Sequence, residues 1–493
     1  MQKTGKWKSL APVAGALAAL GAAGAFYWPA LGSYFASDDW VILHHYGTVP
    51  WWRLDAHFSP RTIWFYRPLQ SAQFAALYQI FGLNAAAFNA SLLAMHLVVL
   101  SVAFGFVARI SGHLSTAAGV TLFFATSWIY ADILIWKANI NTLQWALATL
   151  AACAALERHL RTGQRGWLVA CWVACGLAFF TKEQAVCLPL LLAWVWWCAR
   201  GRPANRDAVR EGLRVLAVPC GMAAAYVVFH FLFVRNIEPH FKPGYSFANP
   251  LAGTLQILFA LNHSLVPVYA DPLLLAQWPA AQRTVAAAVR WFLLLGPLLA
   301  VYGWWRRDRV LLLGLGWITI TMVPVGFLES FHASRFYYLP ALGAAMVQWR
   351  LLERLVAWGR SRAAWRAVAL AGAVAAGAWM VAANSIRLQQ IIADDVRISR
   401  RMDALMRFLQ EHRQAVEPGS VIVLRNAPQE FFNAGLGARE MVILALNDPT
   451  ADGVVEGQPI ETDREAQLKA RPHRYTVDLA RPQLTLRRVT PLP

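Results

Sequence analysis

The chain has 493 residues, of which 58% are hydrophobic and 15% are charged. Apolar runs of about 20 residues, the length that crosses a bilayer, recur along most of it and exclude an ordinary soluble protein. The net charge of +18 does not indicate a nucleic-acid-binding protein, because Lys and Arg form short clusters between the apolar runs, as cytoplasmic loops of membrane proteins do.

The first apolar run, residues 9–30, follows a lysine-rich N-terminus. It is long enough to cross a membrane and ends in aromatic residues typical of the interface. We therefore expect an uncleaved first span with a cytoplasmic N-terminus. A first outer loop is expected at residues 31–83, and within it residues 51–54 and 65–81 are expected to form amphipathic helices on the membrane face.

The remaining spans are predicted from the alternation of apolar runs with arginine clusters. They are expected at residues 84–108, 114–133, 139–156, 166–180, 185–198, 213–234, 285–305, 310–328, 336–356 and 364–384. Residues 251–270, in a large outer loop at 235–283, are also apolar enough to cross. The later arginine clusters fall on the cytoplasmic side only if this segment does not cross, so we expect a helix that lies on or dips into the outer face.

The fold class predicted for residues 1–384 is therefore an all-α polytopic membrane domain of about eleven spans. The composition changes after residue 384, where a charged amphipathic helix is expected at 385–415. Short strands are expected at residues 421–424, 441–446 and 475–479. These elements predict a small soluble α/β domain over residues 385–493, which the odd number of spans places outside the cell.

Ionisable residues gather at the outer ends of the predicted spans. Asp38 and Asp39 directly follow the first span, and several cations stand at later outer ends, namely Arg67, Lys137, Lys182 and Arg335. Each of these residues alone also fits an interfacial anchor. Together they suit a phosphorylated substrate and an attacking hydroxyl, because the cations would hold the phosphate and a carboxylate would take the proton.

This pattern resembles the first outer loop of the C-type (GT-C) membrane glycosyltransferases, where an acidic pair precedes a basic-proline motif such as Arg67-Pro68-Leu69. The resemblance extends to protein O-mannosyltransferases, aminoarabinose transferases and tetratricopeptide-bearing O-mannosyltransferases. Further motifs follow in the same order, at Trp136-Lys137, at Thr181-Lys182-Glu183 and at residues 335–340. The likeness covers roughly residues 9–356 and implies a GT-C helical bundle.

The resemblance implies transfer of a sugar from a polyprenyl-phosphate-linked donor to a hydroxyl acceptor on a protein, glycan or lipid, at the outer face of the cytoplasmic membrane. It implies that Asp38 is the general base, with Asp39 beside it. The residues implied to bind the donor and its phosphate are Arg67, Lys137, Lys182, Glu183, His332, Arg335 and Tyr338. The family motif departs at Asp39, at the single proline after Arg67 and at Asn139, which leaves the sugar and the acceptor open.

No cofactor is predicted, although a divalent metal remains an alternative. His44 and His45 are adjacent and lack the usual ligand spacing, and Asp132 is the acidic residue on a second outer loop that could complete a site. The six cysteines lie in or beside apolar runs, so we expect buried thiols without disulfides or metal.

Two other functional classes stay open. A transporter or flippase of lipid-linked sugars would also need a basic cavity facing lipid phosphate. It would, however, place ionisable residues near the bilayer midplane, where this sequence has almost none. A non-catalytic envelope scaffold, whose soluble domain does the work, is the other alternative.

Overall fold

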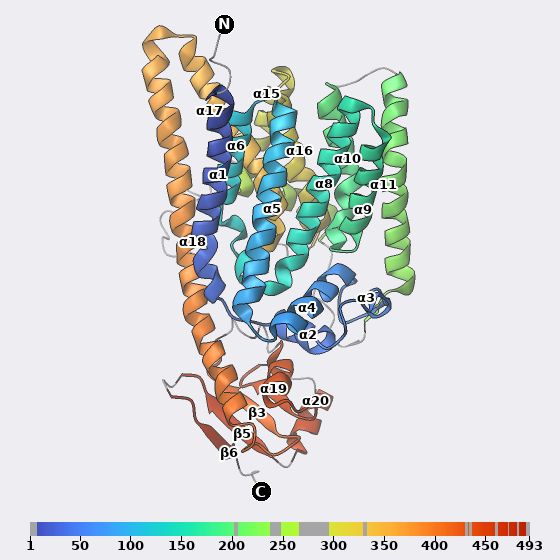
Figure 1. The fold of residues 1–493 in the computed structure, drawn as a ribbon, viewed down its shortest axis with the longest axis vertical. Coiled ribbons are helices and arrows are strands. Elements are labelled where there is room, and N and C mark those ends of the chain that lie inside the picture. Colours follow the sequence, from blue (N-terminus) through green and yellow to red (C-terminus); the bar gives the residue numbers. More distant parts are fainter. Residues whose placement is uncertain are drawn as a thin grey trace.

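The computed structural model is a helical bundle with a small α/β domain at one end (Figure 1). The structure describes residues 7–201, 206–236, 248–265, 295–328, 333–428, 432, 436–458, 462–471, 473–480 and 483–489. The bundle helices are α1 (Trp7–Tyr27), α5 (Ala85–Ser111), α6 (Leu114–Ala125), α8 (Ile140–Thr162), α9 (Arg165–Phe179), α10 (Leu188–Arg200), α11 (Arg206–Phe233), α15 (Leu295–Trp305), α16 (Arg309–Gly326) and α17 (Tyr338–Arg360).

Within the described residues, four helices are both long and apolar enough to cross a membrane. They are Ala85–Ser111, Arg206–Phe233, Arg309–Gly326 and Ala363–Glu411, and shorter apolar helices cover Leu17–Gly32, Leu114–Ala125 and Arg165–Phe179. A polytopic helical protein is thus confirmed, while the count of eleven spans stays a prediction. The six cysteines are free thiols, five of them buried as expected; the exception is Cys220, which is exposed on α11.

The core of the bundle depends on close helix packing between α16 and α17. A side-chain carbon at either Gly314 or Gly343 would lie 2.6 Å from the carbonyl oxygen of the other glycine. Glycine is therefore required for the two backbones to approach, as is common between helices in membranes. The buried Trp317 indole then donates a hydrogen bond to the Leu339 carbonyl, 3.0 Å away.

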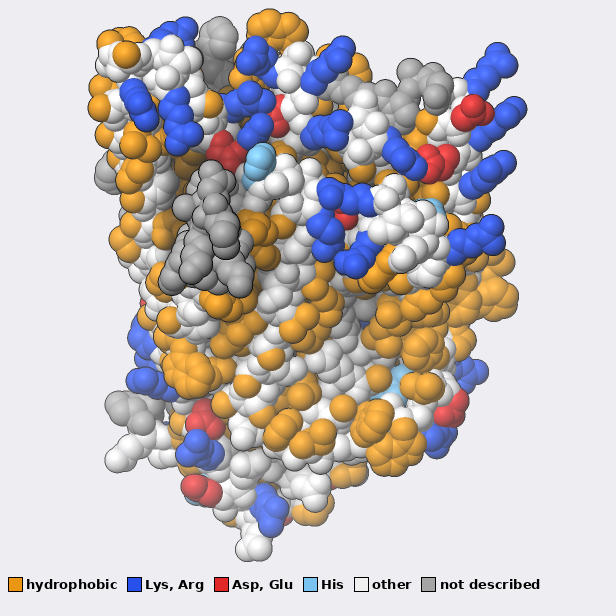
Figure 2. All heavy atoms as spheres, turned by 45° about the horizontal axis from the view of Figure 1, so that its top comes forward, with side chains coloured by type: hydrophobic (Ala, Val, Ile, Leu, Met, Phe, Trp, Pro, Cys, Tyr) orange, Lys and Arg blue, Asp and Glu red, His pale blue; other side chains and the backbone are white. Residues whose placement is uncertain are grey.

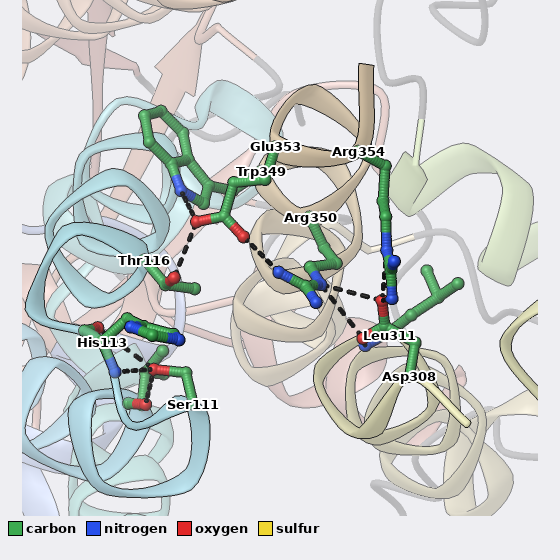
Figure 3. Close-up of polar contacts among 10 residues, drawn as sticks. Ser111, His113, Thr116, Asp308, Leu311, Trp349, Arg350, Glu353 and Arg354 are labelled. Atoms are coloured by element: carbon green, nitrogen blue, oxygen red, sulfur yellow. Dashed lines mark hydrogen bonds and ion pairs between the residues drawn. The ribbon is translucent and has the colours of Figure 1, made fainter. Parts of the chain in front are cut away.

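A buried ion network ties the same two helices together at the N-terminal end of the bundle (Figure 3). Asp308 caps α16 by accepting a hydrogen bond from the Leu311 N–H, and it also accepts 2.8 Å bonds from Arg350 and Arg354 of α17. Burial alone would raise the pKa of Asp308, but the bonds from the two arginines hold it below its ordinary value. Glu353 continues the network toward α6, where it accepts from Thr116.

The segment predicted as the first outer loop, residues 31–83, is more ordered than expected. It contains α2 (Asp38–Tyr46), α3 (Leu54–His57), α4 (Pro68–Phe81) and the short strand β1 (Arg61–Thr62), which pairs in parallel with β2 (Arg235–Asn236). The helix predicted at residues 51–54 was wrong, because Trp51 and Trp52 form a turn and α3 begins only at Leu54. The helix expected at 65–81 is confirmed from Pro68, a residue that favours the first turn of a helix.

Helix α12 (Pro250–Leu265) inserts beside α16 and α17. Its Ile257 side chain lies against Gly326, and the Leu265 carbonyl accepts a hydrogen bond from Gln348, about three turns into α17. The segment therefore packs into the bundle and does not lie flat on its surface. The predicted span at 285–305 is described only from residue 295, as α15, and the rest of the loop at 266–283 lies outside the described residues.

The long helix α18 (Arg366–Glu411) runs without a break from the bundle into the C-terminal domain (Figure 1). The domain boundary predicted at residue 384 therefore falls inside a helix. The domain holds β3 (Val421–Arg425), α19 (Ala438–Leu446), β4 (Asp452–Val455), α20 (Thr462–Lys469), β5 (Arg474–Asp478) and β6 (Leu486–Val489). The sheet order is β4-β3-β5-β6, with β6 antiparallel to β5 and the other pairs parallel.

The strands predicted at 421–424 and 475–479 are confirmed, but the strand predicted at 441–446 was wrong because these residues belong to α19. Ala438, Met441, Val442 and Ala445 are all buried, which is the spacing of one helical face. A short apolar run does not by itself distinguish a strand from a buried helix.

The two ends of the bundle differ in character. Helices α2, α3 and α4 lie at the same end as the C-terminal domain, and the N-terminus lies at the other (Figure 1). Figure 2 shows Lys and Arg side chains gathered at the N-terminal end, next to a broad band of hydrophobic side chains. This distribution is the one that cytoplasmic loops and a lipid-facing belt produce.

Candidate active site

A cavity lies beneath the first outer loop, and four of the predicted site residues line it. Asp38 begins α2 and Arg67 precedes α4, while Lys182 follows α9 and Arg335 lies in the short helix η6 (Ser334–Tyr337). Other lining residues are Ile42, Tyr46, His57, Thr62, Ile63, Trp64, Phe65, Gln70, Ser71, Trp136, Ala138, Asn139, Asn141 and Phe336.

Asp38 presents a carboxylate to this cavity. Its Oδ1 accepts a hydrogen bond from the Ser37 hydroxyl at 3.3 Å, and no cation of the described residues lies within 4 Å of it. Burial raises the pKa of Asp38, whereas the positive charges of Arg335 and Arg67 act in the opposite direction. A carboxylate with a raised pKa and no ion-pair partner can take a proton from a reacting group.

Two cations in the cavity, Lys182 and Arg335, have no carboxylate within 4 Å among the described residues. The buried Lys182 Nζ donates to the Thr142 hydroxyl at 2.7 Å. Burial, together with Arg67 and Arg335, lowers its pKa well below the ordinary value for lysine. The Arg335 guanidinium lies 5.2 Å from the ring centres of Trp136 and Phe336. Both cations can therefore hold an anionic group.

Arg67 differs because Glu183 already binds it. The guanidinium donates to both carboxylate oxygens of Glu183, with the shortest bond, from Nη2 to Oε2, at 2.7 Å. It also lies 4.1 Å from the ring centre of Phe65. The pair fixes the direction of Arg67 at the cavity and offsets part of its charge.

Asp39 and Lys137, by contrast, are buried outside the cavity lining. The Asp39 carboxylate accepts from the backbone N–H groups of Ala138 at 2.6 Å and Ala36 at 3.0 Å. Lys137 donates to the carbonyls of Ser33, at 2.9 Å, and Tyr34. Burial raises the pKa of Asp39 and lowers that of Lys137, while each charge stabilises the other. The two residues join the chain before α2 to the turn that contains Ala138.

The other predicted residues lie elsewhere. The Tyr338 hydroxyl lies 2.6 Å from His96 Nδ1 inside the bundle and does not line the cavity. His332 lies outside the described residues. His44 and His45 neighbour each other on α2, and neither they nor Asp132 line the cavity. No group of three His, Cys, Asp or Glu side chains within the described ranges is arranged to hold a metal.

Several cavity residues escaped the sequence-based prediction. His57 is held by Ser71, 3.1 Å from Nδ1, and by the Pro50 carbonyl, 3.2 Å from Nε2, and burial lowers its pKa. Asn139, which the sequence singled out only as a departure from the family motif, and Asn141 also line the cavity. Their position directly after the Trp136-Lys137 motif is the signal that could have identified them.

No protein-family model matches the chain, and no curated protein sequence does either. The chain is similar in overall arrangement to solved structures of membrane glycosyltransferases. ArnT from Cupriavidus metallidurans bound to undecaprenyl phosphate is 14% identical, with 96% of this chain and 93% of that chain covered and a TM-score of 0.47. The apo state of ArnT from the same organism is also 14% identical. The match covers 97% of this chain and 93% of that chain, with a TM-score of 0.49.

The oligosaccharyltransferase from Archaeoglobus fulgidus in the apo form is also 14% identical to the chain. The match covers 89% of this chain and 64% of that one, with a TM-score of 0.49.

Proposed function

We propose that the protein is an integral membrane glycosyltransferase of the GT-C type. It moves a sugar from a polyprenyl-phosphate-linked donor to a hydroxyl of a protein, glycan or lipid, with Asp38 as the general base. The observation that carries the proposal is the position of Asp38 in the same cavity as Lys182 and Arg335. Transfer of a sugar from a phosphate leaving group needs a group that takes up a proton and cations that stabilise the phosphate, all in one cavity.

In the reaction, the acceptor oxygen forms a bond to the anomeric carbon of the sugar while the bond from that carbon to the phosphate oxygen breaks. The acceptor proton passes to the Asp38 carboxylate. The electron pair of the broken bond stays on the polyprenyl phosphate, which gains a negative charge. Lys182 and Arg335 stabilise that charge, Arg through a fork of donors and Lys as a point charge.

The location of the cavity supports a lipid-linked donor. It lies at the end of the bundle that carries α2 and α4, opposite the end rich in Lys and Arg (Figure 1, Figure 2). Positively charged ends of membrane proteins face the cytoplasm. The cavity would then open at the outer face of the cytoplasmic membrane, at the depth of a lipid head group, and the C-terminal domain would be extracytoplasmic.

The test compares Asp38→Asn with Asp55→Asn in proteoliposomes. Asn keeps the size of the side chain but cannot take the proton, so transfer should fall by roughly 10²–10⁴. Binding of undecaprenyl phosphate to the purified protein should be retained. Asp55 is a matched control, because it is exposed in the same loop, pairs with Arg53 and does not line the cavity.

The assay follows radiolabelled sugar from undecaprenyl-phosphate hexoses and aminopentoses into solubilised envelope material. Near wild-type turnover of Asp38→Asn would overturn the proposed mechanism. A parallel assay with EDTA tests the divalent-metal alternative, since chelation should abolish transfer only if a metal takes part.

A further inference from the structure

The C-terminal domain contacts the candidate site through α19, which packs against α2 (Figure 1). The two residues before α19, Leu436 and Gly437, also contact this part of the bundle, and we refer to them as the 436–437 junction. Leu436 packs against a small hydrophobic cluster of Val41, Ile63 and Trp64. Ile63 and Trp64 line the cavity, so this domain supports part of the cavity wall.

Gly437 makes the closest approach. A side-chain carbon there would lie 2.3 Å from the carbonyl oxygen of Ser37 and 3.3 Å from the Trp40 side chain. Gly437 also has a φ of +84°, which L-residues with a side chain rarely adopt. Both the available space and the backbone conformation therefore require glycine at this position.

Ser37, the residue that Gly437 touches, is itself in an uncommon conformation. Its φ of 47° and ψ of −116° lie in a region that residues other than glycine seldom occupy. Such a conformation persists only when its surroundings hold it. Ser37 is joined to Asp38 by the chain and by the hydrogen bond from its hydroxyl, so its backbone sets where α2 and the Asp38 carboxylate begin.

The domain is held against the bundle independently of the junction. In α18, the Ser399 hydroxyl accepts a hydrogen bond from the Tyr34 N–H at 2.8 Å, and the Gln389 side chain donates to the Phe26 carbonyl at 2.6 Å. These contacts lie on another element from Gly437. A change at the junction should therefore disturb Ser37 without releasing the domain.

We propose that the 436–437 junction is a positioning element of the transferase site. It holds Ser37 in its uncommon conformation and thereby keeps the Asp38 carboxylate in the cavity that Lys182 and Arg335 also line. The inference rests on the proposed role of Asp38 as the general base. The soluble domain is then a part of the catalytic unit, although neither junction residue touches the reacting atoms.

The test compares Gly437→Ala with Gly457→Ala in the full-length protein. Gly457 is a matched control, because it lies in the same domain with a φ of +80° and has nothing within 4 Å of an added side-chain carbon. Hydrogen exchange of the backbone amides of α2 reports on whether the junction still stabilises the conformation of Ser37. The kcat of sugar transfer and the binding of undecaprenyl phosphate report separately on Asp38 and on the cations.

We expect Gly437→Ala to speed exchange in α2 and to lower kcat roughly 10- to 100-fold, with undecaprenyl phosphate binding unchanged. Gly457→Ala should leave all three measurements unchanged. Leu436→Ala, which removes packing without a clash, should give a smaller effect of the same kind and serves if Gly437→Ala does not fold.

Unchanged exchange in both junction variants would show that the junction does not stabilise the conformation of Ser37. Faster exchange with a wild-type kcat would show that this conformation does not position Asp38. An equal loss of kcat and of lipid binding would also overturn it, since that result indicates a general collapse of the cavity. The Asp38→Asn variant separates the two proposals. If it is inactive while Gly437→Ala is fully active, only the present inference fails. If Asp38→Asn is fully active, the proposed function fails instead.

Discussion

Lys182 and Arg335, which have no carboxylate within 4 Å among the described residues, should provide most of the donor-phosphate affinity. Lys182→Met and Arg335→Gln each remove one positive charge from the cavity. Methionine is similar in length to lysine, and glutamine keeps a shorter polar side chain in place of arginine. In both variants the phosphate of the donor would lose a charge-assisted hydrogen bond. Lys182 contributes a single ammonium next to Thr142, whereas Arg335 offers a planar fork over Trp136 and Phe336.

The expected magnitude follows from the environment of each cation. A hydrogen bond to a charged group contributes about 1.5–3 kcal/mol, and each 1.4 kcal/mol is about tenfold in affinity. Because neither residue has a described carboxylate within 4 Å, no ion pair with the described part of the chain reduces this contribution. Each variant should therefore weaken binding of undecaprenyl phosphate roughly 10- to 150-fold. Arg67 should contribute less, since Glu183 already binds its fork.

Lys182 should also make donor binding depend on pH. Burial and the neighbouring arginines lower its pKa, so it loses its charge at a lower pH than an exposed lysine does. Affinity for undecaprenyl phosphate should then fall as the pH rises through the pKa of Lys182. The Lys182→Met variant should lack this dependence, because its side chain cannot titrate.

The assay is a titration of the purified protein with undecaprenyl phosphate, followed by native mass spectrometry. Arg53→Gln is the control, since Arg53 is exposed in the same outer loop, pairs with Asp55 and does not line the cavity. Wild-type affinity in both Lys182→Met and Arg335→Gln would refute the assignment of the phosphate site. A loss of equal size in Arg53→Gln would show that only the overall surface charge matters.

Two further predictions concern stability and topology. Asp308→Asn leaves Arg350 and Arg354 without their shared carboxylate and should destabilise the protein by up to about 3 kcal/mol. The measurement is a lower Tm. The control is Asp403→Asn, which breaks an exposed ion pair and should leave the Tm unchanged. Since the pKa of Asp308 is lowered in the folded protein, its stabilisation should be complete above the ordinary pKa of aspartate and should disappear as the pH falls through the lowered value. In a Cys220→Ser background, Ala466→Cys should react with an impermeant maleimide in intact cells and Ser361→Cys only after lysis; the reverse pattern would contradict the proposed sidedness.

Membership of the cavity was predictable from the sequence for Asp38, Arg67, Lys182 and Arg335. Each stands at the predicted outer end of an apolar run, so the predicted alternation of spans places all of them in one layer even though they are far apart in the chain. Helix packing then decides which residues of that layer meet. The helix packing cannot be predicted from the alternation of apolar runs and charge clusters.

Side-chain direction was not predictable in the same way. Residues 38 and 39 were expected to act side by side at the start of a loop, but they begin the helix α2. Neighbours on a helix point about 100° apart, which is why Asp38 faces the cavity and Asp39 turns into the protein. Lys137 was assigned to the donor for its position in a motif, and its buried backbone contacts give it a different environment.

The charges around the cavity explain why this arrangement suits transfer from a phosphodiester. Asp39 and Lys137 balance each other outside the lining, and Glu183 balances Arg67. Among the described lining residues, Asp38, Lys182 and Arg335 remain, and with Lys182 protonated they carry one excess positive charge, which matches a singly charged sugar phosphodiester. When the sugar leaves, Asp38 becomes neutral by protonation as the phosphate gains a second charge. The protonation of Asp38 and the charge gained by the phosphate compensate each other. The cavity therefore favours a transition state in which proton transfer and departure of the phosphate are both under way.

Glu183→Gln tests this balance directly. The substitution removes the charge opposite Arg67 and so makes the cavity more positive. Undecaprenyl phosphate should bind more tightly, because an additional cation faces its phosphate. The same charge should lower the pKa of Asp38, on which Arg67 already acts in that direction, and a weaker base should reduce kcat.

Tighter lipid binding together with slower transfer is therefore the expected result, measured by titration and by radiolabelled transfer on the same preparation. A general loss of structure would weaken both. If binding weakened while kcat stayed at the wild-type value, Glu183 would serve to orient Arg67 toward the donor, and the charge-balance argument would be wrong.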